Sequence, residues 1–346
     1  MKYILISFLL IFTSACSTSK KRTLTPKEYL NEVFVIIEKK SINRDSIDLQ
    51  SIKKVAYAKL KDTDSIENCY PIIQSILKNL RDNHSRFLTR EQVNKWESTS
   101  LVGDNQNLIT FSGKLLNENI GYIHMKGFSS GDSISIQKYA DSLQHQIKSI
   151  DNKNLNGWIL DLRENSGGNC WPMLTGIGPL LGNGICGFFL DNNGNKSPWF
   201  YRDGESGYNN TTITKISGQP YKLLNGSNPI AILTGPRTAS SGEVVSTAFR
   251  NKSNTKSFGL NSAGLSTGNE IFKLSDGAII LLTTSIYVDR NGNVFGDKIK
   301  PDEIIDYGYQ TIGQPNDPAI KKAIDWINKK QHHTTVRKEL KNENTL

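Results

Sequence analysis

The sequence predicts an α/β fold in which a helical N-terminal part precedes a core of buried strands. Residues 24–97 carry apolar side chains at helical spacing, as amphipathic helices do. Two later runs, residues 157–162 and 229–234, are short and mainly apolar, and each is followed by a glycine-bearing turn and a segment of helical periodicity. Strands that alternate with helices pack as α/β layers, and functional groups collect at the carboxyl ends of such strands.

Residues 1–16 have the pattern of an export signal, in which a positive start and an apolar run lead to small residues and Cys16. The pattern resembles a bacterial lipoprotein signal. We therefore expect Cys16 to become a lipidated N-terminus, followed by a linker over residues 17–24. Thr13 departs from the aliphatic residue usual at its position, which keeps a secreted or soluble periplasmic chain open as the alternative. The mature chain is expected to lie outside the cytoplasm, anchored to a membrane through the N-terminal lipid only.

The composition argues against several classes of function. The formal net charge of +9 is spread along the chain, and no basic stripe is interleaved with aromatic residues, so we predict no nucleic-acid partner. No Cys/His cluster has zinc-ligand spacing, and we predict neither a metal nor a cofactor. Cys170 and Cys186 could form a disulfide in an oxidising compartment, but their redox state stays open.

Residues 25–97 are predicted to form a helical N-terminal domain. The first helix begins at Thr25-Pro26-Lys27-Glu28, which combines an N-cap residue, a proline at the first helical position and a capping-box glutamate. Two further apolar stripes follow. The third helix should end near Arg81-Asp82-Asn83, which leaves His84 and Ser85 in a loop.

Residues 98–330 are predicted to form the core domain, and residues 331–346 a charged tail. The expected elements of the core are a hairpin over 108–128, a helix over 133–150, a strand over 157–162, a helix over 171–181, a strand over 184–190, a strand over 229–234 with its helix, strands near 269–274 and 278–288, and a helix over 318–330. The segment from 157 to 190 predicts a βαβ unit. Residues 191–228 are weakly patterned and predict either a surface excursion or a loop that borders the site.

Ser240 lies where the strand at 229–234 leads into a helix. Free backbone N–H groups and the positive end of the helix dipole converge at such a position, which suits a nucleophile whose attack on a carbonyl creates an oxyanion. The competing interpretation is structural. Ser240 and Glu243 together form a capping-box pattern, and most serine-rich helix starts are only caps.

Two other stretches complete a catalytic pattern. A serine hydroxyl needs a neighbouring base, and His84 is the histidine placed in a suitable loop. The other histidines lie in a strand, on a polar helix or in the tail: His124, His145, His332 and His333. Gly167-Gly168 follows the buried strand at 157–162 and offers an anion-binding backbone, although a glycine pair also serves a tight turn.

These motifs resemble those of the C-terminal processing, or tail-specific, peptidase family and its tricorn and retinoid-binding relatives. The resemblance covers roughly residues 70–310. It rests on Asp82-Asn83-His84-Ser85, Ile159-Leu160-Asp161-Leu162-Arg163-Glu164-Asn165-Ser166-Gly167-Gly168, Thr238-Ala239-Ser240-Ser241-Gly242-Glu243 and Ile299-Lys300-Pro301-Asp302. It implies a crotonase-like core of βαβ units and β-strands, with Ser240 as nucleophile and the N–H groups of Ser241 and of Gly167 or Gly168 as oxyanion donors.

The chain departs from the tail-specific pattern at the base. The family's lysine position corresponds to Leu265, which cannot accept a proton, so the resemblance is to the tricorn-like branch with a histidine base, matched by His84. That branch orients its histidine through a serine and a glutamate. Ser85 is the candidate serine, Asp297 the nearest acid and Asp82 a second acid, so the orienting group stays open.

The segment from about 89 to 118 is too short for the PDZ domain that tail-specific members usually carry, which leaves a preference for C-terminal residues in doubt. The sequence thus predicts an extracytoplasmic serine peptidase that acts on peptides or proteins through Ser240 and His84. The alternatives are a catalytically silent binding protein that holds a peptide, glycan or hydrophobic ligand, and an esterase. The oligomeric state and the physiological substrate are not specified by the sequence.

Overall fold

The computed structural model describes residues 24–61, 64–101 and 109–343. The predicted signal peptide, Cys16 and most of the linker lie outside the described residues. Within the described ranges, no helix is long and apolar enough to cross a membrane.

Three helices form the predicted N-terminal lobe: α1 (Pro26–Lys40), α2 (Leu49–Ala58) and α3 (Cys69–Lys78). The capping box at the start of α1 is confirmed, because Glu28 N–H donates to Thr25 Oγ1 (3.2 Å) and Thr25 N–H donates to Glu28 Oε2 (2.9 Å). The apolar faces of these helices share one buried cluster with Ile280 and Leu282 of strand β12 (Ile279–Asp289). The helical lobe is therefore packed onto β12.

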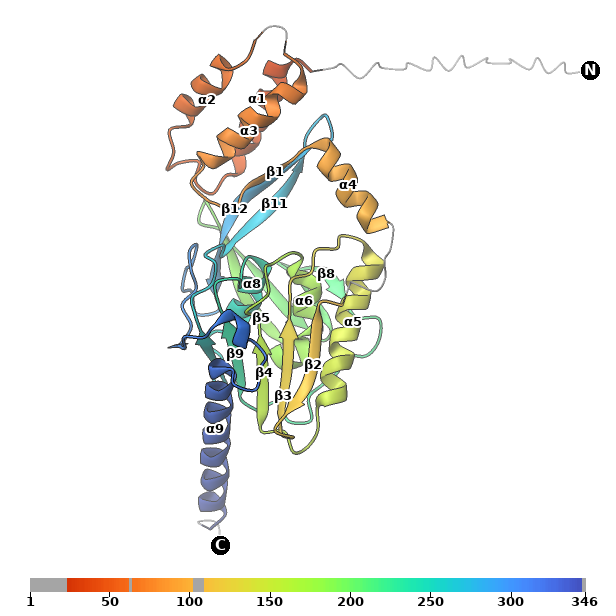
Figure 1. Ribbon diagram of the computed structural model, residues 1–346, viewed down its shortest axis with the longest axis vertical. Coiled ribbons are helices and arrows are strands. Elements are labelled where there is room, and N and C mark those ends of the chain that lie inside the picture. Colours follow the sequence, from red (N-terminus) through yellow and green to blue (C-terminus); the bar gives the residue numbers. More distant parts are fainter. Residues whose placement is uncertain (1–23, 62–63, 102–108, 344–346) are drawn as a thin grey trace, which may run out of the picture.

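A six-stranded sheet forms the centre of the described chain (Figure 1), in the order β13-β10-β9-β4-β3-β2. Its strands are β2 (Phe111–Leu116), β3 (Ile120–Met125), β4 (Gly157–Asp161), β9 (Ile230–Thr234), β10 (Thr255–Gly259) and β13 (Glu303–Ile304). The predicted hairpin is the antiparallel pair β2–β3, and the other neighbours pair in parallel. Parallel strands are normally buried on both faces.

Helices cover both faces of this sheet. One face packs on α5 (Ser133–Ile150), α6 (Cys170–Gly176) and α8 (Ser241–Phe249), and the other on α9 (Pro318–Glu343). Side chains of β4 alternate between the two, with Leu160 in the first cluster and Ile159 in the second. Helix α5 has the predicted bounds, whereas α9 continues through the residues predicted to be a charged tail.

A second sheet is antiparallel and, in the described chain, has seven strands in the order β1-β12-β5-β6-β7-β8, with β11 also paired to β12. The strands are β1 (Arg86–Leu88), β5 (Gly184–Asp191), β6 (Lys196–Arg202), β7 (Glu205–Tyr208), β8 (Thr211–Lys215), β11 (Thr267–Lys273) and β12 (Ile279–Asp289). Strands β1, β11 and β12 form an arm between the helical lobe and the core (Figure 1).

The predicted βαβ unit from 157 to 190 is wrong. Strand β4 belongs to the parallel sheet, but β5 pairs antiparallel with β12 and β6 in the other sheet. The predicted helix between them is divided into α6 and a short α7 (Gly178–Leu181), and Gly182 then turns the chain at φ 72°. The true parallel crossovers are β3-α5-β4 and β9-α8-β10.

Two other sequence expectations also need correction. Residues 191–228, predicted to be a surface excursion or a loop that borders the site, contain β6, β7 and β8, which form a meander. The predicted helical domain is interrupted by β1, which pairs with β12, and is followed by α4 (Arg90–Leu101).

Cys170 and Cys186 are free thiols, so the disulfide left open by the sequence is not formed.

A buried ion cluster anchors the carboxyl end of β4. Arg163 Nη2 lies 2.6 Å from Asp161 Oδ2 and 2.6 Å from Asp317 Oδ2, and all three side chains are fully buried. The Tyr122 hydroxyl donates to Asp161 Oδ2 (2.8 Å). The cluster ties the end of β4 to the start of α9, and the loop that leaves β4 is thereby held at its base.

Replacing Arg163 with methionine should lower the free energy of unfolding by about 3–5 kcal/mol, because two buried carboxylates lose their partner. Denaturant titration measures this loss. The matched control is Lys40→Met, which breaks a half-exposed pair with Glu270 and should change stability by less than about 1 kcal/mol. A loss in the Arg163 variant no larger than in the control would show that the cluster does not stabilise the fold.

Candidate functional site

Ser240 occupies a strained backbone position at the start of α8. It is the N-cap residue, with φ 50° and ψ −114°, a conformation that non-glycine residues adopt only when their surroundings impose it. The turn that leads to it is fixed by Thr238, whose hydroxyl donates to Leu162 O (2.8 Å) and accepts from Gly235 N–H (3.0 Å). The strand–turn–helix predicted from the sequence is confirmed.

The carboxylate of Glu243 binds the backbone N–H of Ser240. Its Oε2 accepts from Ser240 N–H (2.8 Å), and its Oε1 accepts from Ser262 Oγ (2.5 Å) and Gly264 N–H (3.1 Å). Glu243 is fully buried. Burial raises the pKa of Glu243 to about 7, against the lowering effect of these hydrogen bonds. The capping-box glutamate thus links the serine turn to the turn at residue 264.

The glycine pair after β4 lies against Ser240. Gly167 has φ 104° and Gly168 has φ 118°, the left-handed half of the map that glycine adopts freely. A Cβ on Gly167 would lie 2.9 Å from Ser240 Cβ, and a Cβ on Gly168 would lie 2.0 Å from Phe128 O. Both positions therefore need glycine, for close approach as well as for conformation.

The two glycines differ as oxyanion donors. Gly167 N–H already donates to Asn165 Oδ1 (3.1 Å). In the part of the chain that the structure describes, neither Gly168 N–H nor Ser241 N–H donates a hydrogen bond. The Ser241 hydroxyl donates to Gly168 O (2.6 Å). The Ser241 side chain therefore stabilises the glycine loop. The sequence left the N–H groups of Gly167, Gly168 and Ser241 as candidate oxyanion donors. Of these, Gly168 N–H and Ser241 N–H are free to bind an anion.

His84 lies in the loop between α3 and β1, as predicted. Asp82 fixes this loop, since its Oδ1 accepts from His84 N–H (2.9 Å) and Ser85 N–H (2.7 Å). The side-chain amide of Asn269 in β11 donates to His84 O (3.1 Å). The backbone of the histidine is thus held by its own loop and by the arm of the second sheet.

The imidazole ring of His84 is oriented by Thr267, the first residue of β11. His84 Nδ1 lies 2.7 Å from Thr267 Oγ1. Burial lowers the pKa of His84 to about 4, while Asp82 raises it and Arg86 lowers it further. The imidazole is therefore neutral at pH 7. With the proton on Nδ1 donated to Thr267, the lone pair is on Nε2, which is the state a general base requires.

The orienting residues suggested by the sequence make other contacts. Ser85 Oγ donates to Asp82 Oδ2 (2.7 Å) and accepts from Thr283 N–H (3.0 Å). Asp297 lies beside Gly264, where a Cβ would be 2.9 Å from Asp297 Oδ1. Within the described residues neither side chain hydrogen-bonds to the His84 ring. Thr267, which the sequence analysis overlooked, occupies that place at the end of the Gly264–Thr267 turn.

His84 and Ser240 each have a partner on or beside β12, and in the described chain no direct hydrogen bond joins the two residues. Thr267 is in register with Ile286, and the next residue of β12 is Tyr287. Burial raises the pKa of the Tyr287 phenol well above its usual value, and a hydrogen bond with the Ser240 side chain opposes this rise. Tyr287 is thus a second residue at the site that the sequence analysis missed.

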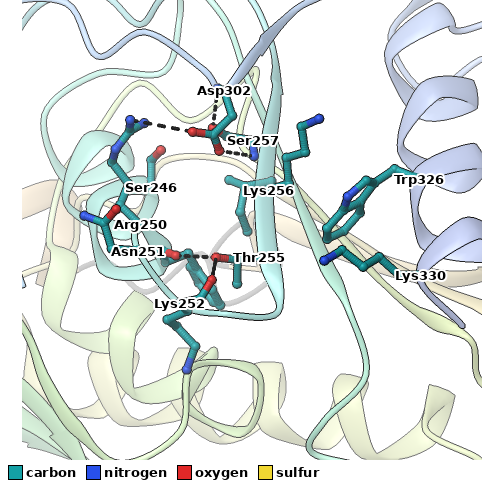
Figure 2. A pocket seen from close by; sticks show the side chains of 12 residues that line it. Ser246, Arg250, Asn251, Lys252, Thr255, Lys256, Ser257, Asp302, Trp326 and Lys330 are labelled. Carbon is teal, nitrogen blue, oxygen red and sulfur yellow. Dashed lines mark hydrogen bonds and ion pairs between the residues drawn. The ribbon is translucent and has the colours of Figure 1, made fainter. Parts of the chain in front are cut away.

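A separate cavity of about 320 Å³ lies at the opposite end of α8 (Figure 2), lined in part by Arg250, Lys256 and Trp326. Arg250 Nη2 lies 3.8 Å from Asp302 Oδ1, and Lys256 Nζ lies 2.8 Å from Glu303 Oε2. Its lining includes neither Ser240 nor His84, so this cavity is distinct from the candidate active site. Among the described residues, no group of three or more His, Cys, Asp or Glu side chains could hold a metal ion.

Comparison with known proteins gives the family of the chain. Residues 119–305 match the model of peptidase family S41. The nisin-resistance protein of Lactococcus lactis subsp. lactis is 27% identical over 304 residues, which cover 88% of this chain and 87% of that protein. The carboxy-terminal processing protease CtpA of Bacillus subtilis (strain 168) is 26% identical over 202 residues, which cover 57% of this chain and 38% of that protein.

Solved structures support the same fold. A lipoprotein from Streptococcus agalactiae superposes with a TM-score of 0.71 at 27% identity and covers 94% of this chain and 100% of its own. The photosystem II D1 C-terminal processing protease gives a TM-score of 0.53 at 14% identity, with 82% of this chain and 94% of that chain covered, which is a likeness of fold. Because the family model spans more than half of the chain, this protein belongs to peptidase family S41.

Proposed function

We propose that this protein is a serine peptidase that hydrolyses peptide bonds with Ser240 as the nucleophile and His84 as the general base. The observation that carries the proposal is the geometry of Ser240. It has a strained backbone at a helix N-terminus, is packed against a diglycine loop, and is flanked by two N–H groups that have no acceptor in the described chain. Membership of a peptidase family makes a peptide or protein the expected substrate.

In the proposed reaction, Ser240 Oγ attacks the scissile carbonyl and its proton passes to His84 Nε2. The carbonyl oxygen becomes an oxyanion between Gly168 N–H and Ser241 N–H, each worth about 3–4 kcal/mol of transition-state stabilisation. His84 then donates the proton to the leaving amine, and a water molecule repeats the sequence to release the acyl group. In this step the Thr267 hydroxyl accepts from Nδ1–H, which leaves the lone pair on Nε2 to take the proton.

The ring of His84 must come within hydrogen-bond reach of Ser240 for this transfer. In the described residues Nδ1 of the ring bonds to Thr267, and no hydrogen bond joins Nε2 to Ser240. Catalytic hydrogen bonds in unliganded enzymes are often long and tighten only when substrate is bound. Because His84 is attached to the arm of β1, β11 and β12, the mechanism requires this arm to bring the ring to Ser240.

Two observations favour a second candidate, a binding protein of the same fold without activity. Leu265 replaces the family's lysine, and an imidazole with a pKa of about 4 is a weak base. An esterase is a third candidate, because the same groups transfer acyl units from esters. Turnover of a peptide and of its matched ester separates the peptidase from the esterase, and turnover of neither supports the binding protein.

We further propose that the protein is extracytoplasmic and anchored to a membrane through a lipid on Cys16. The resemblance of residues 1–16 to a lipoprotein signal supports this proposal, as does the similarity to a streptococcal lipoprotein. The alternative is a secreted or soluble periplasmic protein. Metabolic labelling with a radioactive fatty acid tests the anchor, which is excluded if wild-type protein and a Cys16→Ser variant incorporate the same amount of label.

Ser240→Ala should reduce kcat for peptide hydrolysis by at least about 10³-fold, because no other hydroxyl can replace the nucleophile. The matched control is Ser241→Ala, which removes the neighbouring hydroxyl but keeps the Ser241 N–H, and should retain activity within about tenfold. Cleavage of fluorescein-labelled casein by purified protein measures both. Equal activity of wild type and Ser240→Ala would remove the basis of the proposal.

The pH dependence should report a histidine with a low pKa. His84 must be neutral to accept a proton, so kcat/KM should fall as pH decreases through about 4, below the pKa of about 6.5 that is usual for histidine. Glu243 also titrates, at about 7, and Glu243→Gln removes that group and leaves only the histidine limb. An acidic limb near 6.5 in the Glu243→Gln protein, with its fold intact by fluorescence, would show that the pKa of His84 is not lowered in the working enzyme.

A further inference from the structure

Strand β11 has one open edge next to the candidate site. Within the described chain it pairs with β12 alone. Its first residue, Thr267, holds the His84 ring, and Asn269 holds the His84 carbonyl. The strand therefore begins at the proposed base and runs away from it along the arm. Unpaired strand edges present a row of free N–H and C=O groups that can pair with another extended chain.

The backbone groups that face the open edge follow from the antiparallel alternation. Leu274 N–H donates to Ala278 O (2.8 Å), and residues two apart along β11 repeat this orientation toward β12. Glu270 and Phe272 are thus bonded to β12. The N–H and C=O of Ile271 and Lys273 point the other way, to the open edge.

The side chains beside this edge are suited to contact a ligand. Phe272 packs against the buried cluster of the helical lobe, so Ile271, its neighbour in a pleated strand, lies on the opposite face. Ile271 is 59% exposed. Such a β-branched apolar side chain favours the pairing of its strand with another. The described part of β11 has no proline, a residue that often blocks pairing at exposed edges.

We propose that an extended peptide substrate binds as an added strand on the open edge of β11, with its backbone bonded to Ile271 and Lys273. This inference rests on the proposed function, because a peptide is the occupant that a peptidase must bring to His84 and Ser240. Ile271 lies four positions after Thr267, which is about 13 Å along a strand. The edge therefore recognises substrate residues about four positions from the scissile bond, and it selects unfolded segments, since only an extended backbone can pair.

Binding is measured in a Ser240→Ala background, so that hydrolysis does not interfere, with fluorescein-labelled casein as the probe. Ile271→Pro removes the N–H at the open edge and leaves the ladder with β12 intact. It should raise the Kd about tenfold, whereas the matched control Ile271→Ala, which keeps the N–H, should raise it less than about threefold. Equal Kd values for Ile271→Pro and Ile271→Ala would overturn the proposal.

Hydrogen exchange gives a test that needs no strand variant and still applies if Ile271→Pro does not fold. Casein should slow exchange of the Ile271 and Lys273 amides in the Ser240→Ala protein. Unchanged exchange at both amides, or protection without casein in a protein that sediments as a dimer, would overturn the proposal, since a second copy would then occupy the edge.

A fluorophosphonate probe separates this proposal from the proposed function. If the probe labels Ser240 but the Kd for casein is the same in Ile271→Pro and Ile271→Ala, only the edge proposal fails. If the probe labels nothing and binding still depends on the N–H of Ile271, the edge proposal stands and the peptidase function fails.

Discussion

The buried carboxylate of Glu243 is the interaction on which the arrangement of the site depends. One oxygen holds the N–H of Ser240, and the other holds Ser262 and the N–H of Gly264. The chain from Gly264 leads directly to Thr267, which bonds to the ring of His84. A single side chain thus connects the turn that presents the nucleophile with the strand that presents the base, although the two belong to different sheets.

This constraint has a physical cost. The Glu243 carboxylate is fully buried and has no cationic partner among the described residues, and its loss of hydration raises its pKa to about 7. Ser240 adds backbone strain at φ 50°. A buried acid that is bonded only to neutral donors contributes less to stability than to geometry. The ion cluster of Arg163, Asp161 and Asp317 fixes the end of β4, from which the glycine loop begins.

Local patterns were sufficient to predict the parts of the site that are local in sequence. The turn at Ser240, the hairpin before α5 and the loop at His84 follow from residues that are neighbours in the chain. Thr267 could not be predicted as the partner of His84, because 183 residues separate them and only the pairing of β11 with β12 brings them together. The wrong βαβ unit has the same origin, since periodicity indicates a strand but not the sheet that it joins. The choice of Gly168 over Gly167 as a donor depends on the side chain of Asn165, which composition cannot reveal.

The most direct test of the central claim is the structure of the protein after reaction with a fluorophosphonate. We expect phosphorus bonded to Ser240 Oγ and a phosphonyl oxygen about 3 Å from both Gly168 N and Ser241 N. His84 Nε2 should then lie within about 3 Å of Ser240 Oγ, with Thr267 still bonded to Nδ1. An unreacted Ser240, or an adduct whose oxygen points away from both N–H groups, would contradict this claim.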